Sequence, residues 1–404
     1  MTEKKSLSQS VRDALNARQQ TQQWESFIAE MLQKLELSPA ERGRAEQRYR
    51  ELARHLARKL GVGENDVHVV IQGSMRTQTT ISPRGNQKFD LDIVVKLTGP
   101  RFNRVTHSEP FFREFGEALK GVGETAGDPK AKKRCWRLQY PGEPFYFDVT
   151  PALPNSLGIT GTDLRVRDPE TVWSPSNPEE FAKWFCDIAG KRFPFQAPQI
   201  KRALESRAEI DPLPNSRVGL DDILRRALQL IKLHRENYYW ALSEERKEAR
   251  PISIVLVTLA GRAYDHLVRT NPRAFASPIE VVLEMAELLP SWLERRNGSI
   301  WVGNPSLPSE NFADRWKDDD GAREREFFSW HARLMADLEA LFSEDFSKRS
   351  EQRIKNVFGQ VAVDARNSVL ATPGVLSGLL SVMPVAARAN PTAPVRSGSK
   401  NTLA

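Results

Sequence analysis

Apolar side chains recur at helical intervals in the first 60 residues, where Pro39 is the only proline. The recurring positions are Trp24, Phe27, Ile28, Met31, Leu32 and Leu35. Spacings of three and four residues place these side chains on one face of a helix. We therefore expect two helices in this region, with a break near Ser38 and Pro39 and an end at Gly61.

Two later segments have the patterns of β-strands. Residues Val67–Ile71 are rich in β-branched side chains and lead into Gln72–Ser74, which predicts a strand followed by a turn. Every second residue of Phe89–Leu97, starting from the first, is apolar. Because side chains of a strand alternate between its two faces, Asp90 and Asp92 then project together from the face opposite to the apolar one.

A further pair of strands is expected over Cys135–Tyr140 and Phe145–Leu153. The segment Pro141–Pro144 between them has the composition of a turn. In the second strand, Asp148 lies on the face opposite to that of Phe147. This strand therefore adds a third carboxylate that has hydrophobic neighbours on both sides.

The chain becomes helical after the proline-rich stretch Asp168–Pro178, for which we expect irregular structure. Helices are predicted over Glu179–Ala189 and Ile252–Tyr264. Between them, a long amphipathic helix is expected from Val218, with the acidic pair Asp221–Asp222 in its first turn. Its apolar stripe consists of Leu220, Ile223, Leu224, Ala227, Leu228, Ile231 and the stem of Lys232. Strands in roughly residues 65 to 155 with helices around and after them predict an α+β protein with a helical second lobe.

The composition indicates which general class of protein has this pattern. The 404 residues are 40% hydrophobic and 27% charged, which is typical of a soluble globular protein. The longest apolar run, Ile254–Ala260 with only Thr258 inside it, is far shorter than the roughly 20 residues that span a bilayer. Met1–Ser10 does not resemble a secretory signal, so we expect a cytoplasmic protein without a membrane partner. Cys135 and Cys186 are expected to be reduced structural thiols. The formal net charge of +7 is spread along the chain in runs that mix acidic and basic residues. Charge alone therefore does not indicate a function.

The three carboxylates Asp90, Asp92 and Asp148 are the strongest chemical signal in the chain. Like charges on one face of a strand raise each other's pKa and destabilise the sheet unless a cation neutralises them. A divalent ion with oxygen ligands is such a cation, and magnesium commonly combines protein carboxylates with substrate phosphates. The alternative for Asp90 and Asp92 is an exposed strand edge with solvated acids.

Gly73 and Ser74 precede this cluster at the end of a predicted strand. Glycine allows the backbone to approach a ligand closely, and the N–H and hydroxyl groups that follow can donate to a phosphate oxygen. Alone, the pair indicates only a turn. The informative feature is the order: a strand, Gly-Ser, a loop, a strand with Asp-x-Asp and then a strand with a single Asp.

This order resembles the active-site signature of the polymerase-β-like nucleotidyltransferases. More narrowly, the chain is similar to the bacterial CD-NTases, relatives of cyclic GMP-AMP synthase and oligoadenylate synthase that occur in anti-phage signalling (CBASS) operons. The similarity covers roughly residues 20 to 385 and is carried by Gln72–Thr77, Phe89–Val95, Phe147–Ala152, Ser176–Phe185 and Asn304–Trp316. The resemblance implies a nucleotidyltransferase core sheet with N-terminal helices, over residues 1–205, and a helical lobe over residues 206–385. Residues 386–404, rich in Pro, Ser, Ala, Thr and Asn, are expected to form a disordered tail.

The resemblance also implies roles for individual residues. Asp90 and Asp92 would hold two magnesium ions, for which manganese can substitute, and these ions would bridge the donor triphosphate. Asp148 would share the second ion and help to deprotonate the ribose hydroxyl of the acceptor. Gly73 and Ser74 would contact the phosphates of the donor.

Two further residues match phosphate-binding positions of the family, namely Lys232 on the long helix and Ser253 after the next turn. The alternative for Lys232 is a stem that lies along the apolar face with its charge in water. The alternative for Ser253 is a plain helix cap.

The resemblance favours template-independent synthesis of a cyclic di- or trinucleotide second messenger from nucleoside triphosphates, with ATP and then GTP as candidate substrates. Two alternatives stay open. One is a linear oligonucleotide synthase or transfer of a nucleotide to RNA or protein, and the other is a catalytically silent sensor of nucleotides or nucleic acids. Expected partners are a downstream effector that binds the cyclic nucleotide and an enzyme like those of ubiquitin conjugation, which would act on the tail at Ala404.

Overall fold

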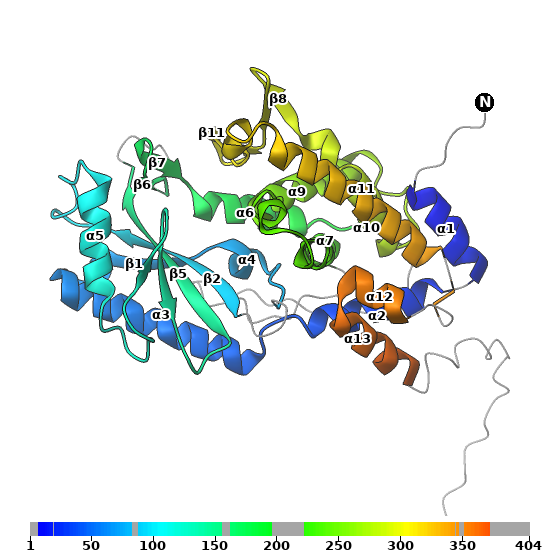
Figure 1. Ribbon diagram of the computed structural model, residues 1–404, viewed down its shortest axis with the longest axis horizontal. Coiled ribbons are helices and arrows are strands. Elements are labelled where there is room, and N and C mark those ends of the chain that lie inside the picture. The colour runs from blue at the N-terminus through cyan, green and yellow to red at the C-terminus, as the bar shows by residue number, and fades with distance from the viewer. Residues whose placement is uncertain are drawn as a thin grey trace, which may run out of the picture.

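The computed structural model describes residues 7–18, 20–82, 88–155, 162–195, 222–343, 345–346 and 351–371. Two bodies lie side by side, one built on a β-sheet and one of helices (Figure 1). The strands are β1 (Val67–Ile71), β2 (Phe89–Leu97), β3 (Lys130–Ala131), β4 (Trp136–Gln139), β5 (Phe145–Pro154), β6 (Leu164–Asp168), β7 (Val172–Ser176), β8 (Glu294–Arg296), β9 (Ser299–Trp301), β10 (Gly303–Asn304) and β11 (Leu307–Asn311). The helices are α1 (Leu7–Arg18), α2 (Thr21–Gln33), α3 (Pro39–Leu60), α4 (Gly73–Thr77), α5 (Ser108–Leu119), α6 (Pro178–Ala189), α7 (Ile223–Trp240), α8 (Glu244–Glu248), α9 (Ser253–Thr270), α10 (Pro278–Glu287), α11 (Ala322–Phe342), α12 (Glu351–Phe358) and α13 (Gln360–Ala371).

Among the described residues, seven strands form the main sheet, in which β1, β2, β5, β4 and β3 are neighbours in that order and β6 and β7 extend β5. The pair β2 and β5 at its centre is parallel, whereas the other pairs are antiparallel. The apolar face of β2 is buried as its alternation predicts, with Leu91, Ile93, Val95 and Leu97 fully enclosed. They pack with side chains of α3 and α5 into one core.

The predicted boundaries of the strands β1 and β2 are confirmed, and the α+β class is confirmed. The expectation of irregular structure over Asp168–Pro178 is wrong, because β7 pairs with β6 there. Among the described strands, β7 pairs only with β6 and lies at the edge of the sheet. Proline has no backbone N–H to donate, and an edge strand tolerates it because one side of the strand pairs with no other strand. The expected turn after β1 is also wrong, since the helix α4 begins at Gly73 and the hydroxyl of Thr77 donates to its carbonyl oxygen at 3.1 Å.

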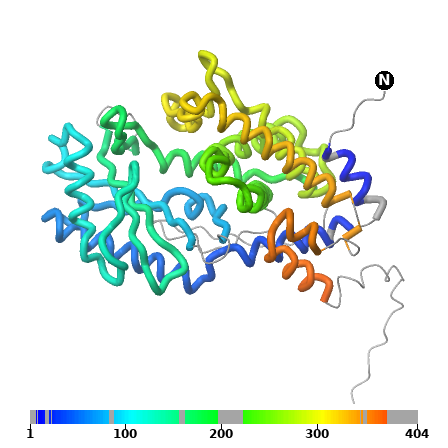
Figure 2. The backbone as a smooth tube through the Cα atoms, viewed as in Figure 1, coloured from blue at the N-terminus to red at the C-terminus, as the bar shows by residue number. Residues whose placement is uncertain are grey.

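The N-terminal region contains three described helices rather than the two that the periodicity predicts. The break at Pro39 is confirmed, because Ser38 caps α3 in a capping box with Glu41. α1 packs against α10 and α2 against α13, so the start of the chain joins the helical body before α3 crosses to the sheet (Figure 2). Trp24 of α2 is fully buried edge-on to Phe342 at a centroid distance of 4.9 Å.

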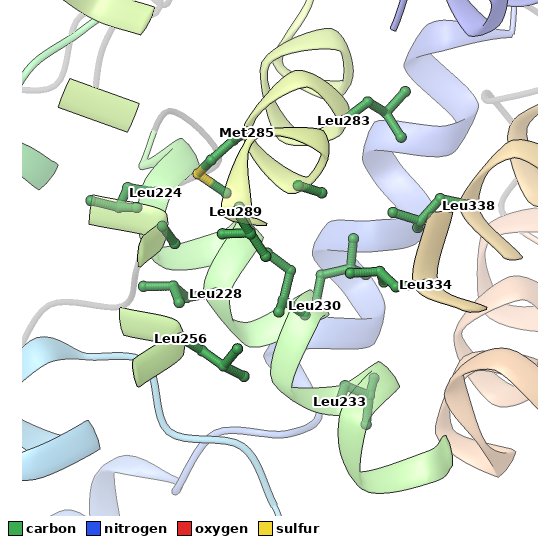
Figure 3. Packing of buried hydrophobic residues seen from close by; sticks show 14 of the residues in the cluster. Leu224, Leu228, Leu230, Leu233, Leu256, Leu283, Met285, Leu289, Leu334 and Leu338 are labelled. Atoms are coloured by element: carbon green, nitrogen blue, oxygen red, sulfur yellow. The ribbon is translucent and has the colours of Figure 1, made fainter. Parts of the chain in front are cut away.

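The helical body has its own hydrophobic core around α7. Leucines of α7 share this core with side chains of α9, α10 and α11, and Figure 3 shows members of the cluster from close by. α7 is therefore buried along most of its circumference, which explains why polar residues on it are enclosed as well. The expectation that Asp222 lies inside the first turn is wrong, because this residue is the N-cap and accepts from the backbone N–H of Arg225.

The predicted division at residues 205 and 206, the tail over 386–404 and Ala404 lie outside the described residues and stay predictions. Cys135 and Cys186 are free thiols, as expected. In the described parts of the chain, no helix combines the length and the apolarity that crossing a bilayer requires.

Candidate active site

Strand pairing brings the three predicted carboxylates together. In the parallel register of β2 and β5, Asp92 lies opposite Asp148, and Asp90 precedes Asp92 by two positions on the same face. Oxygen atoms of Asp90, Asp92 and Asp148 all lie within 4.8 Å of one another. Asp90 is exposed, Asp92 is half-buried and Asp148 is buried, so the cluster reaches from the surface into the sheet.

The negative charge of this cluster is only partly compensated. Although Asp90 is exposed at the surface, the protein around its carboxyl group removes part of its solvation. This loss of solvation, followed by the repulsion from Asp148, raises the pKa of Asp90 from its ordinary value of 3.8 to about 6. Burial and then the charges of Asp90 and Asp148 raise the pKa of Asp92 to about 7. A positive charge placed among these oxygens would reverse both effects, because it favours the ionised carboxylates.

Arg137 is a functional candidate that the sequence alone did not indicate. It lies on β4 directly opposite Asp148, and its Nε and Nη2 donate to the two oxygens of Asp148 at 2.7 and 2.6 Å. Its guanidinium also lies over the ring of Tyr146, 3.9 Å from the ring centroid. Only the register of β4 on β5 creates this bidentate pair, so periodicity within either strand could not have revealed it.

Gly73 fits closely beside Asp92. Its φ of +63° lies in the left-handed region, and a Cβ at this position would stand 2.4 Å from Oδ2 of Asp92. The position therefore excludes any side chain on both grounds. Ser74 follows in the first turn of α4, and its Oγ accepts a hydrogen bond from the hydroxyl of Thr80 at 3.3 Å.

Lys232 is buried, with 3% of its surface exposed, so the alternative of a charge held in water is wrong. Its Nζ donates to the hydroxyl and the carbonyl oxygen of Thr79 at 2.7 and 3.2 Å. Burial and then the charge of Arg235 lower the pKa of Lys232 from 10.5 to about 7. A buried ammonium group with a lowered pKa is a common feature of functional sites.

Ser253 begins α9, but it is not the helix cap that the sequence left open. The N-cap is Ile252, and no side chain caps this end of the helix. The Oγ of Ser253 instead accepts from Nη1 and Nη2 of Arg235, each at 3.2 Å. The serine is thus fixed by an arginine from α7.

A cleft of about 390 Å³ joins these residues. One side carries Asp90 and Asp92 with the start of α4, and the other carries α7, α9 and the hairpin of β10 and β11; the elements that line it meet where the two bodies adjoin (Figure 1). Six of the seven predicted site residues line the cleft: Gly73, Ser74, Asp90, Asp92, Lys232 and Ser253. Asp148 does not line the cleft, but its carboxylate oxygen lies within 4.8 Å of those of Asp90 and Asp92, so it still belongs to the cluster.

The donor set fits a divalent metal ion. Three carboxylates present oxygen ligands within 4.8 Å of one another, and hard cations such as magnesium prefer oxygen ligands. The raised pKa values of Asp90 and Asp92 mean that a bound cation would relieve a repulsion already present in the fold.

Comparison with known proteins finds relatives of this chain. Residues 21–188 match the model of the Second Messenger Oligonucleotide or Dinucleotide Synthetase domain. The chain is 28% identical over 312 aligned positions to a protein of Roseivirga ehrenbergii named c-di-GMP synthase, which covers 73% of this chain and 74% of that protein. It is 26% identical over 410 aligned positions to the cyclic dinucleotide synthase CdnG of Bradyrhizobium diazoefficiens, with 91% and 93% of the two chains covered. The similarity to the bacterial CD-NTases that the sequence indicates is thus borne out over this part of the chain.

Solved structures agree with this assignment of the fold. The complex of Bradyrhizobium diazoefficiens CdnG with GTP superposes on this chain with a TM-score of 0.64 at 22% identity, covering 85% of this chain and 97% of that one. The GTP-bound form of DncV from Vibrio cholerae gives a TM-score of 0.52 at 19% identity, with 89% and 88% covered. The predicted α+β fold with its core sheet is thus confirmed.

Proposed function

We propose that this protein is a CD-NTase that joins nucleoside triphosphates without a template into a cyclic di- or trinucleotide and releases pyrophosphate. The observation that carries the proposal is the cluster of Asp90, Asp92 and Asp148 beside a cleft of about 390 Å³. The names of two relatives, a c-di-GMP synthase and a cyclic dinucleotide synthase, support the same product class. The solved complex of CdnG with GTP supports GTP among the substrates, and ATP is the other candidate.

Asp90, Asp92 and Asp148 would hold the metal, which we propose to be magnesium, with manganese as a substitute. When bound, such an ion neutralises the triphosphate and lowers the pKa of the acceptor hydroxyl. In the reaction, the oxygen of a ribose hydroxyl bonds to the α-phosphorus of the donor, and the bond from that phosphorus to pyrophosphate breaks. We assign uptake of the hydroxyl proton to a carboxylate oxygen of Asp148.

The remaining predicted residues have hydrogen-bonding capacity left for a triphosphate. An ammonium group has three N–H donors, and Lys232 uses two of them on Thr79, so one is left for a phosphate oxygen. The oxygen of Ser253 accepts from Arg235, which leaves its O–H free to donate into the cleft. Gly73 lets the backbone of α4 lie against Asp92, so that Ser74 faces the same ligand.

The proposal has a cellular part that follows from the family. We infer that the cyclic nucleotide acts as a second messenger in anti-phage defence and binds a downstream effector. Modification of the chain at Ala404 by an enzyme like those of ubiquitin conjugation belongs to this inference as well. Deleting the last few residues in cells that carry the neighbouring genes should abolish the linkage, and an unchanged linkage would contradict this part.

The first experiment incubates the purified protein with each labelled ribonucleoside triphosphate and with all four, in magnesium or manganese, and then treats the products with phosphatase. A cyclic product lacks a terminal phosphate and resists the treatment, whereas a linear oligonucleotide or a free nucleotide is dephosphorylated. Mass spectrometry of the resistant fraction then identifies the bases and the ring size.

The matched variants are Asp90→Asn with Asp92→Asn, and Asp128→Asn as a control. Asp128 is an exposed carboxylate of the same body, with 75% of its side chain accessible, and it does not line the cleft. We expect the resistant product to disappear in the double variant and to be unchanged in the control. A phosphatase-sensitive product, or a product that survives the double substitution, would contradict the proposal.

A further inference from the structure

The segment Thr77–Thr80, which runs on from the end of α4, is held by one face of α7. Side chains of α7 donate hydrogen bonds to three of its backbone carbonyl oxygens. The pairs are Arg225 with Thr77 at 2.9 Å, Gln229 with Thr80 at 3.0 Å and Lys232 with Thr79 at 3.2 Å. The three donors are four and three residues apart, which places them on the same face of the helix. α7 therefore fixes the backbone of this segment at three points.

Thr79 connects the two walls of the cleft. Its backbone N–H donates to the carbonyl oxygen of Ser74 at 2.9 Å, and its hydroxyl oxygen accepts from Nζ of Lys232 at 2.7 Å. Ser74 and Lys232 line the cleft from different elements, α4 and α7, whereas Thr79 is fully buried and does not line it. Thr79 thus lies behind the cleft and is bonded to both sides of it.

The direction of each hydrogen bond at the Thr79 hydroxyl follows from its neighbours. The hydroxyl oxygens of Thr77 and Thr79 lie 2.9 Å apart, and that of Thr77 lies 3.1 Å from the carbonyl oxygen of Gly73. A carbonyl oxygen can only accept, so the hydrogen of the Thr77 hydroxyl points to Gly73 and its oxygen accepts from Thr79. An ammonium group can only donate, so Thr79 accepts from Lys232 and gives its own hydrogen to Thr77.

One directed chain of hydrogen bonds therefore runs from Nζ of Lys232 through two buried hydroxyl groups to the backbone of Gly73. The ammonium group is tetrahedral at nitrogen, so the two N–H bonds aimed at Thr79 fix the direction of the third. Without the hydroxyl of Thr79, the bond to its carbonyl oxygen would remain and the group could rotate about that bond. A donor that is already oriented loses less entropy when it binds a ligand.

We propose that Thr79 is a positioning residue of the triphosphate site, whose hydroxyl sets the orientation of the Lys232 ammonium group relative to Gly73 and Ser74. This inference rests on the proposed function, because it concerns the phosphate-binding part of the same cleft. Thr79 acts through Lys232 and does not touch the ligand itself.

The decisive variant is Thr79→Val. Valine has the same branching and nearly the same volume as threonine, so the packing is kept while the hydroxyl is lost. A hydrogen bond to a charged group contributes enough free energy that we expect triphosphate binding to weaken roughly 10- to 100-fold.

The assay is an equilibrium titration in magnesium with analogues of ATP and GTP in which a methylene group replaces the oxygen between the α- and β-phosphorus. Release of pyrophosphate is blocked in these analogues, because the bond that would have to break is a P–C bond. Affinity is therefore measured without turnover, and an inactive protein still gives a result.

A double-mutant cycle with Lys232→Met distinguishes positioning from a general structural role. If Thr79 acts through Lys232, Thr79→Val should change the affinity by less than about twofold once the ammonium group is gone. A loss of the same factor in both backgrounds would show that Thr79 supports the fold independently of Lys232, and it would overturn the proposal.

Conservative and control variants complete the test. Thr79→Ser keeps the hydroxyl and should bind the analogues nearly as tightly as wild type. Thr258→Val is the matched control, because Thr258 is also fully buried, donates to the carbonyl oxygen of Ile254 at 2.8 Å within α9 and does not line the cleft. Its affinity should equal that of wild type. Thermal melting verifies that each variant is folded, and Thr79→Ala, which adds no atoms, takes the place of Thr79→Val if valine prevents folding.

The outcomes separate this inference from the proposed function. Equal affinities of wild type and Thr79→Val would overturn the role of Thr79, even if a cyclic product is made. If wild type makes no cyclic product while its triphosphate affinity depends on Thr79 through Lys232, the inference stands and the proposed function fails. A wild type that binds neither analogue would overturn both.

Discussion

Replacing Asp92 by asparagine should stabilise the metal-free protein while it abolishes activity. Asp92 is half-buried, and burial together with Asp90 and Asp148 raises its pKa from 3.8 to about 7. Asparagine has nearly the same shape and no charge to bury. The substitution therefore removes an electrostatic cost and keeps the packing of β2.

The magnitude follows from the linkage between pKa and stability. A rise in pKa from 3.8 to about 7 corresponds to about 4 kcal/mol of lost stability when the carboxylate is ionised in the folded protein. Because the folded protein holds this proton more tightly than the unfolded chain, the cost is absent below pH 4, grows as the pH rises and is complete above pH 7. At pH 8 the variant should be up to about 4 kcal/mol more stable, or roughly 5 °C in melting temperature for a chain of 404 residues.

The assay is thermal and urea unfolding in EDTA at pH 5 and pH 8, repeated with magnesium. Wild type should lose stability between the two pH values in EDTA, and the Asp92→Asn variant should lose much less. Magnesium should restore the stability of wild type at pH 8 and have little effect on the variant. If Asp92→Asn is less stable than wild type at pH 8 in EDTA, Asp92 stabilises the fold, and the reasoning from burial and charge repulsion is refuted.

Three other predictions use matched features of the same fold. Gly73→Ala should destabilise the protein by more than Gly61→Ala and should abolish product formation. Both glycines have φ near +64°, but only a Cβ at Gly73 would meet Asp92, at 2.4 Å from its Oδ2. Urea unfolding and the product assay compare the two variants, and equal losses of stability would contradict a role for this contact. Arg137→Met should cost about 3 kcal/mol in the absence of metal, because it leaves the buried carboxylate of Asp148 without its partner, and magnesium should recover part of this loss in a melting experiment. The pKa of Lys232 is about 7 in the folded protein and 10.5 in the unfolded chain, so wild type should gain stability as the pH rises from 7 to 10.5. Lys232→Met should flatten this rise. Parallel profiles of stability against pH for wild type and Lys232→Met would refute the burial of a charge at this position.

Local pattern determined much of the structure. The period of two in Phe89–Leu97 placed Asp90 and Asp92 on one face, and the structure confirms the strand without a change of boundary. The capping residue and proline at Ser38 and Pro39 fixed the start of α3. Such signals are readable because strand and helix periods, caps and turns depend on residues that are neighbours in sequence.

The same local rules failed where backbone context overrode them. Gly73 begins a helix rather than a simple turn, and Pro175 lies in an edge strand rather than in an irregular loop. In both places the deciding factor is a contact from elsewhere in the chain. Gly73 lies against Asp92, and β7 completes the ladder of β6.

Only the tertiary structure determined how the site residues are combined. The register of three strands sets Asp92 beside Asp148 and Arg137 across from it, and the packing of α7 between its neighbours encloses Lys232 against Thr79. The packing of α2 against α13, rather than against the sheet that follows α2 in the sequence, was also decided by the tertiary structure. The sequence by itself determined which residues carry the chemistry and on which face of each element they lie. Which of these faces meet is decided by pairing and packing between segments far apart in the chain, and no local period contains that information.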